Sequence, residues 1–533
     1  MDHLWRICVV MSLVITVYGN GKRPNIVFIL TDDQDVTMNG MTPLVNTVSL
    51  IGKQGITFNN MFVSSPLCCP SRSSIFTGNY VHNHKTLNNS ISGGCSNKNW
   101  QSGPERSTFA TYLKGMGYST FFAGKYLNQY GTKLAGGVSH IPPGWDEWNG
   151  LVKNSKYYNY TLSVNGKAEQ HGDDYHHDYL TDLINNRSHE FLEKQSESTP
   201  PFFVMVSTPA CHAPFDSAPQ YVQNFTKNAA PRGPSFNKAG KDKHWLIRHA
   251  PNPMAKSSVT ILDDVFRKRW RTLLSVDDMV KNIVDTLDSK KLLDSTYIIF
   301  TSDNGYHLGQ FSLPMDKRQL YEFDIRVPLL VRGPKIKAGT VTDHIAVNID
   351  IMPTIVHLAG DPAPQNVDGI SLVPILIPNI TESDEDKRDC LTKNKEENTV
   401  EDCPNTDPHT SPAGSRDFLI EHSGEWLPHG DFGCKNTDLC AQCYPDCVCE
   451  DSRNNTYSCL RHIDTKSNYE YCELKDEESF QEYYDLNKDP HQLTNTIKSV
   501  KPPDLAAMHK LLVLLQLCKG DNCRQLIPPH TRH

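Results

Sequence analysis

Residues 25–35 read Asn-Ile-Val-Phe-Ile-Leu-Thr-Asp-Asp-Gln-Asp, an apolar run that stops at a group of acidic residues. The run is rich in β-branched and aromatic side chains and too short for a typical helix, so it predicts a buried strand. Residues 296–305 repeat this arrangement, because Thr-Tyr-Ile-Ile-Phe leads there into Thr-Ser-Asp-Asn-Gly. Helical stretches, such as the one expected from Val276 to Asp288, alternate with such runs from about residue 22 to residue 375, which is typical of an α/β fold.

The two polar endings predict one metal site. In open α/β sheets the binding crevice lies beyond the carboxyl ends of parallel strands, so endings far apart in sequence can converge there. Asp32, Asp33, Asp303 and the amide oxygen of Asn304 are hard oxygen ligands, which suit calcium, with magnesium as the alternative, and do not suit zinc. At this point they could equally be turn formers and helix caps.

A third segment, Cys68-Cys69-Pro70-Ser71-Arg72, resembles the sulfatase signature Cys-x-Pro-Ser-Arg. The first cysteine of that signature is oxidised during synthesis to formylglycine, an aldehyde. The resemblance implies that the hydrated aldehyde at Cys68 attacks sulfur with one hydroxyl and expels sulfate with the other. The alternative is that the segment holds half of a disulfide in a turn.

Further motifs follow in the order found in sulfatases of the alkaline-phosphatase-like superfamily, and the chain is similar to the glucosamine-6-sulfatase branch of that family. The resemblance covers nearly the whole chain after the N-terminal segment. It implies a large central mixed, mostly parallel sheet flanked by helices, with a smaller α+β C-terminal subdomain. The motifs are Gly124–Asn128, Lys153–Tyr160, Lys243–Arg248, Phe266–Trp270, Leu274–Asp278, Ser302–His307, and Tyr484–Leu486 with Asp489, Pro490 and Asn495.

The resemblance also implies catalytic roles. Arg72 would hold the aldehyde hydrate, and Lys125 and Lys317 would grip the sulfate. Lys317 or His212 would protonate the departing sugar oxygen. One calcium ion would bind Asp32, Asp33, Asp303 and Asn304 together with the modified Cys68 side chain.

The sequence does not identify which residue is the base that eliminates sulfate. Many arylsulfatases place a histidine two residues after the active-site lysine, where this chain has Leu127. The glucosamine-6-sulfatase branch has the same Gly-Lys-Tyr-Leu-Asn sequence there, so the change does not suggest inactivity. His212 is the first choice for the base and His307 the second.

Substrate contacts are expected from four residues. His307 and His84 follow site motifs, and His422 and Glu425 belong to a segment, Glu421–Trp426, that combines carboxylates, an imidazole and an aromatic ring. Such groups stack on sugars and bind their hydroxyls. A surface turn around Ser423 and Gly424 is the alternative for this segment.

Composition limits the class of protein. The chain has 533 residues and 38% hydrophobic content, enough for one large core and a smaller one. Its net charge of −8 would not attract a polyanionic glycan, so any attraction must come from a local cationic cleft. We expect a signal peptide at 1–19, a catalytic domain at 22–375, an acidic exposed loop at 381–416 and a cysteine-rich subdomain at 417–533.

Cysteines and sequons indicate the secretory pathway, with a lysosomal or secreted destination. Seven cysteines lie between Cys434 and Cys472, and disulfides are favoured over a zinc ribbon at Cys440 and Cys443; Cys518 and Cys523 could close another small loop. No later segment resembles a membrane span. The expected glycosylation sites are Asn88, Asn159, Asn186, Asn224, Asn379 and Asn454.

Three functions are consistent with the sequence. The first is hydrolysis of 6-O-sulfate esters of N-acetylglucosamine in heparan or keratan sulfate. The second is a sulfatase for another sulfated carbohydrate, and the third is a catalytically silent glycan-binding homologue. The first two require the formylglycine-generating enzyme as a partner during maturation, and none involves nucleic acid.

Overall fold

The computed structural model describes residues 22–378, 415–425 and 446–526. The expected signal peptide, nearly all of the acidic loop, the sequon at Asn379 and the cysteines Cys434, Cys440 and Cys443 lie outside these ranges. Within them, every helix is too short or too polar to cross a bilayer.

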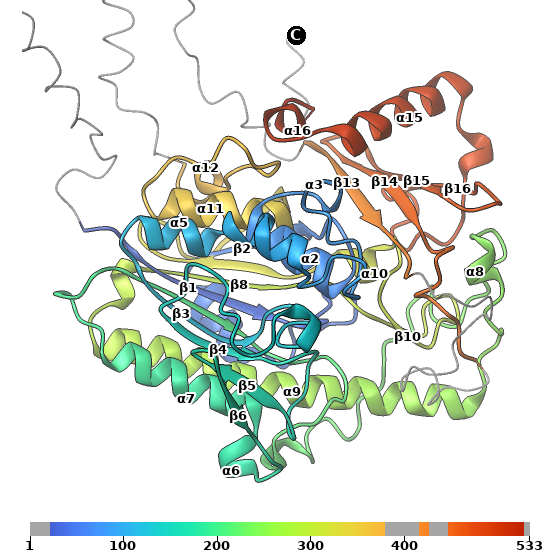
Figure 1. The fold of residues 1–533 in the computed structure, drawn as a ribbon. Coiled ribbons are helices and arrows are strands. Elements are labelled where there is room, and N and C mark those ends of the chain that lie inside the picture. The colour runs from blue at the N-terminus through green and yellow to red at the C-terminus, as the bar shows by residue number, and fades with distance from the viewer. Residues whose placement is uncertain (1–21, 379–414, 426–445, 527–533) are drawn as a thin grey trace, which may run out of the picture.

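A large sheet forms the centre of the molecule (Figure 1). Its strands are β1 (Asn25–Thr31), β2 (Ile56–Phe62), β3 (Ser119–Lys125), β4 (Glu147–Leu151), β5 (Thr161–Val164), β6 (Lys167–Gln170), β7 (Phe202–Ser207), β8 (Thr296–Ser302), β11 (Leu329–Arg332) and β12 (Thr340–Val347). They lie in the order β12-β2-β11-β8-β1-β7-β3-β4-β5-β6. The central strands β8, β1, β7, β3 and β4 are parallel, whereas β11, β5 and β6 are antiparallel to their neighbours. The expected mixed, mostly parallel sheet is confirmed.

Helices cover both faces of this sheet (Figure 1). On one face lie α7 (Leu180–Glu193) and α9 (Lys256–Ser289), and on the other lie α2 (Cys68–Thr77), α5 (Phe109–Gly115) and α11 (Ile351–Leu358). Shorter helices are α1 (Val45–Thr47), α3 (Val81–His84), α4 (Lys98–Ser102), α6 (Tyr175–Asp178), α8 (Trp245–Arg248), α10 (Glu322–Ile325) and α12 (Val373–Leu376). A small hairpin of β9 (His307–Leu308) and β10 (Met315–Asp316) follows β8.

Strand β1 shows why the apolar run is continuous. All of its residues are buried, and they alternate between two cores: Phe28 packs under α2, α5 and α11, whereas Val27 packs under α7 and α9. A parallel strand covered on both faces has no polar side. Because β1 pairs with β8 from Asn25 opposite Thr296 to Thr31 opposite Ser302, their acidic endings emerge side by side.

A second, antiparallel sheet forms the C-terminal part. It consists of β13 (Arg416–His422), β14 (Tyr457–Ile463), β15 (Asn468–Leu474) and β16 (Gln481–Asp485), and α15 (Pro502–Leu517) and α16 (Asp521–Gln525) follow it. A disulfide between Cys459 and Cys472 joins β14 to β15. The expected small loop is confirmed, because Cys518 and Cys523 form a disulfide between the two helices.

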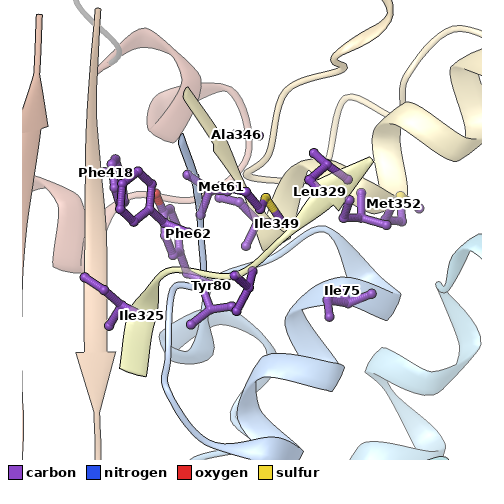
Figure 2. Packing of buried hydrophobic residues seen from close by; sticks show 14 of the residues in the cluster. Met61, Phe62, Ile75, Tyr80, Ile325, Leu329, Ala346, Ile349, Met352 and Phe418 are labelled. Atoms are coloured by element: carbon purple, nitrogen blue, oxygen red, sulfur yellow. The ribbon is translucent and has the colours of Figure 1, made fainter. Parts of the chain in front are cut away.

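The C-terminal sheet continues the core of the large sheet. Figure 2 shows Phe418 of β13 beside Phe62 of β2, and the two ring centres are 5.1 Å apart. The Arg416 guanidinium donates to an Asp350 carboxylate oxygen at 2.9 Å. One hydrophobic cluster contains residues of both sheets, so the two parts share a single core.

Candidate active site

The carboxyl ends of four neighbouring strands bring the predicted residues together. Asp32 and Asp33 follow β1, and Asp303 with Asn304 follows β8. Lys125 ends β3, and His212 lies in the segment after β7. Since β8, β1, β7 and β3 are adjacent and parallel, their side chains meet at one edge of the sheet.

Cys68 is the first residue of α2 and is fully buried. Its sulfur lies 3.9 Å from Oδ1 of Asp32 and 4.0 Å from Oδ1 of Asp33. Burial raises the pKa of the Cys68 thiol to about 11, so an unmodified thiol here would be protonated and a poor nucleophile. The neighbouring Cys69 forms a disulfide with Cys95, so the disulfide expected as the alternative belongs to Cys69 and does not involve Cys68.

Three cations neutralise the three buried carboxylates. Lys125 Nζ lies 2.7 Å from Oδ2 of Asp32, and Lys317 Nζ lies 2.7 Å from Oδ2 of Asp33. Burial alone would raise the pKa of Asp32, but nearby cationic groups, Lys125 foremost, outweigh it and hold that pKa well below its usual range. Burial would likewise raise the pKa of Asp33, but nearby charged groups, Lys317 foremost, outweigh it and lower the pKa of that carboxyl.

Arg72 pairs with the third carboxylate. Its Nε donates to Oδ2 of Asp303 at 2.7 Å, and one terminal nitrogen donates to the carbonyl of Lys125 and to Ser207 Oγ. Because Arg72 lies one helical turn after Cys68, it ties the start of α2 to the ends of β8, β3 and β7.

The residues fit a hard divalent cation. Asn304 Nδ2 donates to Oδ1 of Asp33 at 2.7 Å, and Asn304 Oδ1 is buried without a hydrogen-bond donor in the part of the chain described. A buried acceptor without a donor is costly unless a cation satisfies it. Together with the carboxylates of Asp32, Asp33 and Asp303, this oxygen makes a donor set suited to calcium or magnesium.

His212 has one ring nitrogen, Nε2, that makes no hydrogen bond within the described residues. Its Nδ1 lies 2.7 Å from the carbonyl oxygen of Ala213 and must donate to it, so Nε2 of the neutral ring is an acceptor. Nε2 lies 3.8 Å from Oδ2 of Asp33. Burial, and then Lys317, lowers the pKa of His212 to about 4, which keeps the ring neutral at neutral pH.

Ser155 is a site residue that sequence reasoning did not single out. Its hydroxyl donates to Oδ2 of Asp32, the oxygen that also binds Lys125. The residue lies within the motif Lys153–Tyr160, but a serine in a loop gives no signal of its own.

Two expected substrate residues, His307 and His84, have their ring nitrogens occupied by other protein groups. His307 is fully buried, with Nδ1 3.0 Å from both oxygens of Asp324 and Nε2 3.0 Å from Oε1 of Glu450. Burial opposes the charged ring, but these carboxylates outweigh it and raise the pKa of His307 well above its usual value. Neither ring nitrogen is free for a sugar or for proton transfer, so the structure argues against both roles expected of His307.

His84 is also occupied. Its Nε2 lies 3.0 Å from Ser74 Oγ, and its Nδ1 accepts from the backbone N–H of Thr86 at 3.0 Å. Burial lowers the pKa of His84 to about 3. This histidine braces α2 against α3 and does not face the carboxylate cluster.

His422 and Glu425 lie close to Arg318, the residue after Lys317, whereas Trp426 lies outside the described residues. His422 is 4% exposed, and among described residues neither of its ring nitrogens has a hydrogen-bond partner. Oε1 of Glu425 accepts from the N–H of Asn89 at 3.1 Å, and Asn89 Oδ1 accepts from the N–H of Cys69 at 2.9 Å. Glu425 is therefore two hydrogen bonds from the start of α2.

Arg318 is the cation of this cluster of three residues, Arg318, His422 and Glu425. One terminal nitrogen pairs with Oδ2 of Asp316 at 2.5 Å, while Nε is buried without a hydrogen-bond partner in the described chain. The cation acts electrostatically on both His422 and Glu425. Unpaired buried donors and acceptors of this kind suit a ligand rich in hydroxyl groups.

The sequons differ in exposure. Asn159, Asn186 and Asn224 are exposed, and Asn454 is partly exposed. Asn88 is the exception, because it is 7% exposed and its Oδ1 accepts from the N–H and hydroxyl of Ser90. The fold leaves little room for a glycan there, so the structure argues against that site.

This chain is similar to known proteins in sequence and in fold. The sequence profile of the Sulfatase family matches residues 24–361. An N-acetylglucosamine-6-sulfatase from Homo sapiens is 49% identical over 516 residues, 96% of this chain and 88% of that protein. Another N-acetylglucosamine-6-sulfatase, from Capra hircus, is 50% identical over 508 residues, which are 94% of this chain and 85% of that protein. A solved structure described as a complex with its substrate D-glucosamine-2-N,6-O-disulfate has a TM-score of 0.70 at 21% identity, covering 96% of this chain and all of that one.

Proposed function

The chain belongs to the sulfatase family, and from this premise we propose that it hydrolyses 6-O-sulfate esters of N-acetylglucosamine in glycosaminoglycans. The observation that carries the proposal is the position of Cys68, buried between two carboxylates that are themselves paired with Lys125 and Lys317. Identity of about half over nearly the whole chain to two N-acetylglucosamine-6-sulfatases supports the choice of sugar and of position.

We propose that the formylglycine-generating enzyme converts Cys68 to formylglycine and that Asp32, Asp33, Asp303 and Asn304 hold one calcium ion. The hydrated aldehyde would supply two hydroxyls on one carbon, one to attack sulfur and one to expel sulfate, a pair that no unmodified side chain offers. The ion supplies Lewis acidity, which lowers the pKa of that hydroxyl and offsets negative charge on the sulfate.

The remaining residues bind the sulfate and move protons. Lys125 and Lys317 each carry an ammonium that can hold a sulfate oxygen, and Arg72 fixes the start of α2 through Asp303. His212 is neutral with Nε2 free, so it serves as the base when sulfate leaves. Lys317 then remains as the donor to the sugar oxygen.

The cluster of Arg318, His422 and Glu425 is proposed to recognise the sugar. Arg318, His422 and Glu425 offer two donor or acceptor nitrogens, a cation and a carboxylate, which can bind the hydroxyls of one terminal residue. A site that binds hydroxyls rejects analogues lacking them, because its buried polar groups are then left unpaired.

The compartment is proposed to be the secretory pathway, ending in the lysosome or outside the cell. Disulfides at Cys69–Cys95, Cys459–Cys472 and Cys518–Cys523 support it, because such bonds persist in oxidising compartments. Four described sequons with exposed or partly exposed asparagines fit the same route.

Defined sulfated sugars test the proposal. Purified protein should hydrolyse N-acetylglucosamine 6-sulfate at the non-reducing end of an oligosaccharide much faster than the 3-sulfate or N-acetylgalactosamine 4-sulfate. Preference for another sugar would favour a different carbohydrate sulfatase. Binding without turnover, with an unmodified Cys68 thiol in peptide mass spectra, would favour a silent glycan-binding homologue.

A further inference from the structure

Arg269 of α9 lies behind the site and has no role in the reaction as described so far. Its side chain is 2% exposed. One terminal nitrogen donates to the carbonyl oxygen of Asp33 at 2.7 Å and to Oδ1 of Asp35 at 2.9 Å. The other lies 3.5 Å from the carbonyl oxygen of Cys211, and the guanidinium carbon lies 4.1 Å from the centre of the Tyr306 ring.

These contacts reach three different strand endings. Asp33 and Asp35 follow β1, Cys211 follows β7, and Tyr306 follows β8. Each of the three segments also carries a group aimed at Cys68 or at the proposed metal: the Asp33 carboxylate, the His212 ring next to Cys211, and Asn304 two residues before Tyr306. One side chain of α9 therefore contacts all three segments.

The backbone at Asp33 requires such support. Its φ is 60°, in the left-handed region that costs a residue with a Cβ atom about 1 kcal/mol or more. Its carbonyl oxygen accepts from Arg269, and the Cys211 sulfur lies 3.5 Å away. If this peptide rotated, the carboxylate that binds Lys317 Nζ and Asn304 Nδ2 would turn away from them.

We propose that Arg269 is a positioning residue for the proposed metal site. It holds the left-handed Asp33 backbone and the segment before His212 so that carboxylate and imidazole point at Cys68, while it touches no reacting group itself. Lysine cannot replace it, because a single ammonium lacks the planar fork that spans a carbonyl and a carboxylate while stacking on a ring. The proposal rests on the metal site described under Proposed function.

The test compares Arg269→Lys with Arg271→Lys. Arg271 lies on the same helix, and its Nε donates to the carbonyl of Asn224, remote from Asp33. Calcium is titrated by calorimetry into chelator-treated protein, and kcat and KM are measured on N-acetylglucosamine 6-sulfate. In Arg269→Lys the calcium Kd should rise at least tenfold and kcat should fall at least tenfold, with KM within threefold. Arg271→Lys should match the parent.

A folded Arg269→Lys with parental calcium Kd and kcat would overturn the proposal, since loss of stability alone changes neither in the folded protein. If that variant does not fold, Asp35→Asn decides: it weakens the guanidinium contact and should raise the calcium Kd at least threefold, and a parental Kd would count against Arg269. If the parent binds no calcium, the metal site itself is wrong. In that case a tenfold fall in kcat at constant KM in Arg269→Lys supports a positioning role for Arg269, and a parental kcat contradicts it.

Discussion

Nδ1 of His82 lies 2.9 Å from Oε1 of Glu421, which joins α3, just after the helix of Cys68, to the first strand of the C-terminal sheet. Nε2 of the same ring lies 2.9 Å from the carbonyl oxygen of Cys518. Both ring nitrogens therefore face acceptors, an arrangement that favours the imidazolium form.

This contact predicts a pH-dependent stability. Burial lowers the pKa of His82, but the hydrogen bond to Glu421 and the surrounding acceptors outweigh it, so the net shift is upward. Stabilisation is then fully present below the ordinary histidine pKa of about 6.5 and is lost as pH rises through the folded pKa. His82→Gln should cost about 1.5–3 kcal/mol at pH 5.5 and little at pH 9, checked by thermal unfolding at both values. His509→Gln, on an exposed ring, is the control. An equal loss at both pH values would contradict the prediction.

The adjacent cysteines should respond differently to substitution. Cys68→Ala should fold and show no sulfatase activity. Cys69→Ala should keep the modification of Cys68 and much of the activity at moderate temperature, while losing the disulfide to Cys95, worth about 3–4 kcal/mol for a loop of this size. Activity assays and peptide mass spectrometry check both. An active Cys68→Ala beside an inactive Cys69→Ala would refute the proposed nucleophile.

Metal binding is best tested at Asn304. Chelation should abolish activity, and calcium should restore it. Asn304→Ala should weaken calcium binding at least tenfold, because it removes the buried Oδ1 that has no donor among the described residues. It should also lower the melting temperature, because the Nδ2 hydrogen bonds to Asp33 Oδ1 and to the Gly305 carbonyl are lost. Asp303→Ala is expected to lose stability as well, since it leaves the buried Arg72 guanidinium without its carboxylate, at a cost of about 3–5 kcal/mol. Unchanged calcium affinity in Asn304→Ala would remove that residue from the site.

The cluster of Arg318, His422 and Glu425 should determine specificity. His422→Ala and Glu425→Gln should reduce kcat/KM for N-acetylglucosamine 6-sulfate by about 10–100-fold. For a small aryl sulfate the reduction should be less than about threefold, because that substrate needs only the sulfate contacts of Lys125 and Lys317. Steady-state kinetics on both substrates give the comparison. Equal losses on both would assign these residues to folding or to the chemical step.

The sequence could predict those parts of the site that depend on strand endings or on a motif. Asp32 and Asp303 were expected to converge because parallel strands end at one edge, and β1 does pair directly with β8. The helix expected from Val276 to Asp288 is the second half of α9. Its first half was not predicted, although Leu262, Phe266 and Trp270 recur at helical spacing on one buried face, which is a signal the sequence does offer.

Contacts between distant segments could not be predicted in this way. His307 follows a site motif, yet Glu450, which occupies its Nε2, lies 143 residues later in the chain. Arg269 lies within a quoted motif, but its contacts with Asp33 and Cys211 depend on how α9 crosses the sheet. Ser155 gave no signal for the same reason: its partner, Asp32, is 123 residues away.

Because the two sheets share one core, that core cannot be completed until the C-terminal strands have been synthesised. Phe62 and Tyr80 emerge from the ribosome long before Phe418, which packs into the same cluster in the finished fold. At about 5–20 residues per second, roughly 350 residues between Cys68 and Phe418 take about 20–70 s to synthesise. Cys68 has no exposed surface once folding is complete, so any enzyme that modifies it must act before then. The late arrival of the C-terminal strands therefore lengthens the interval in which this cysteine can be reached.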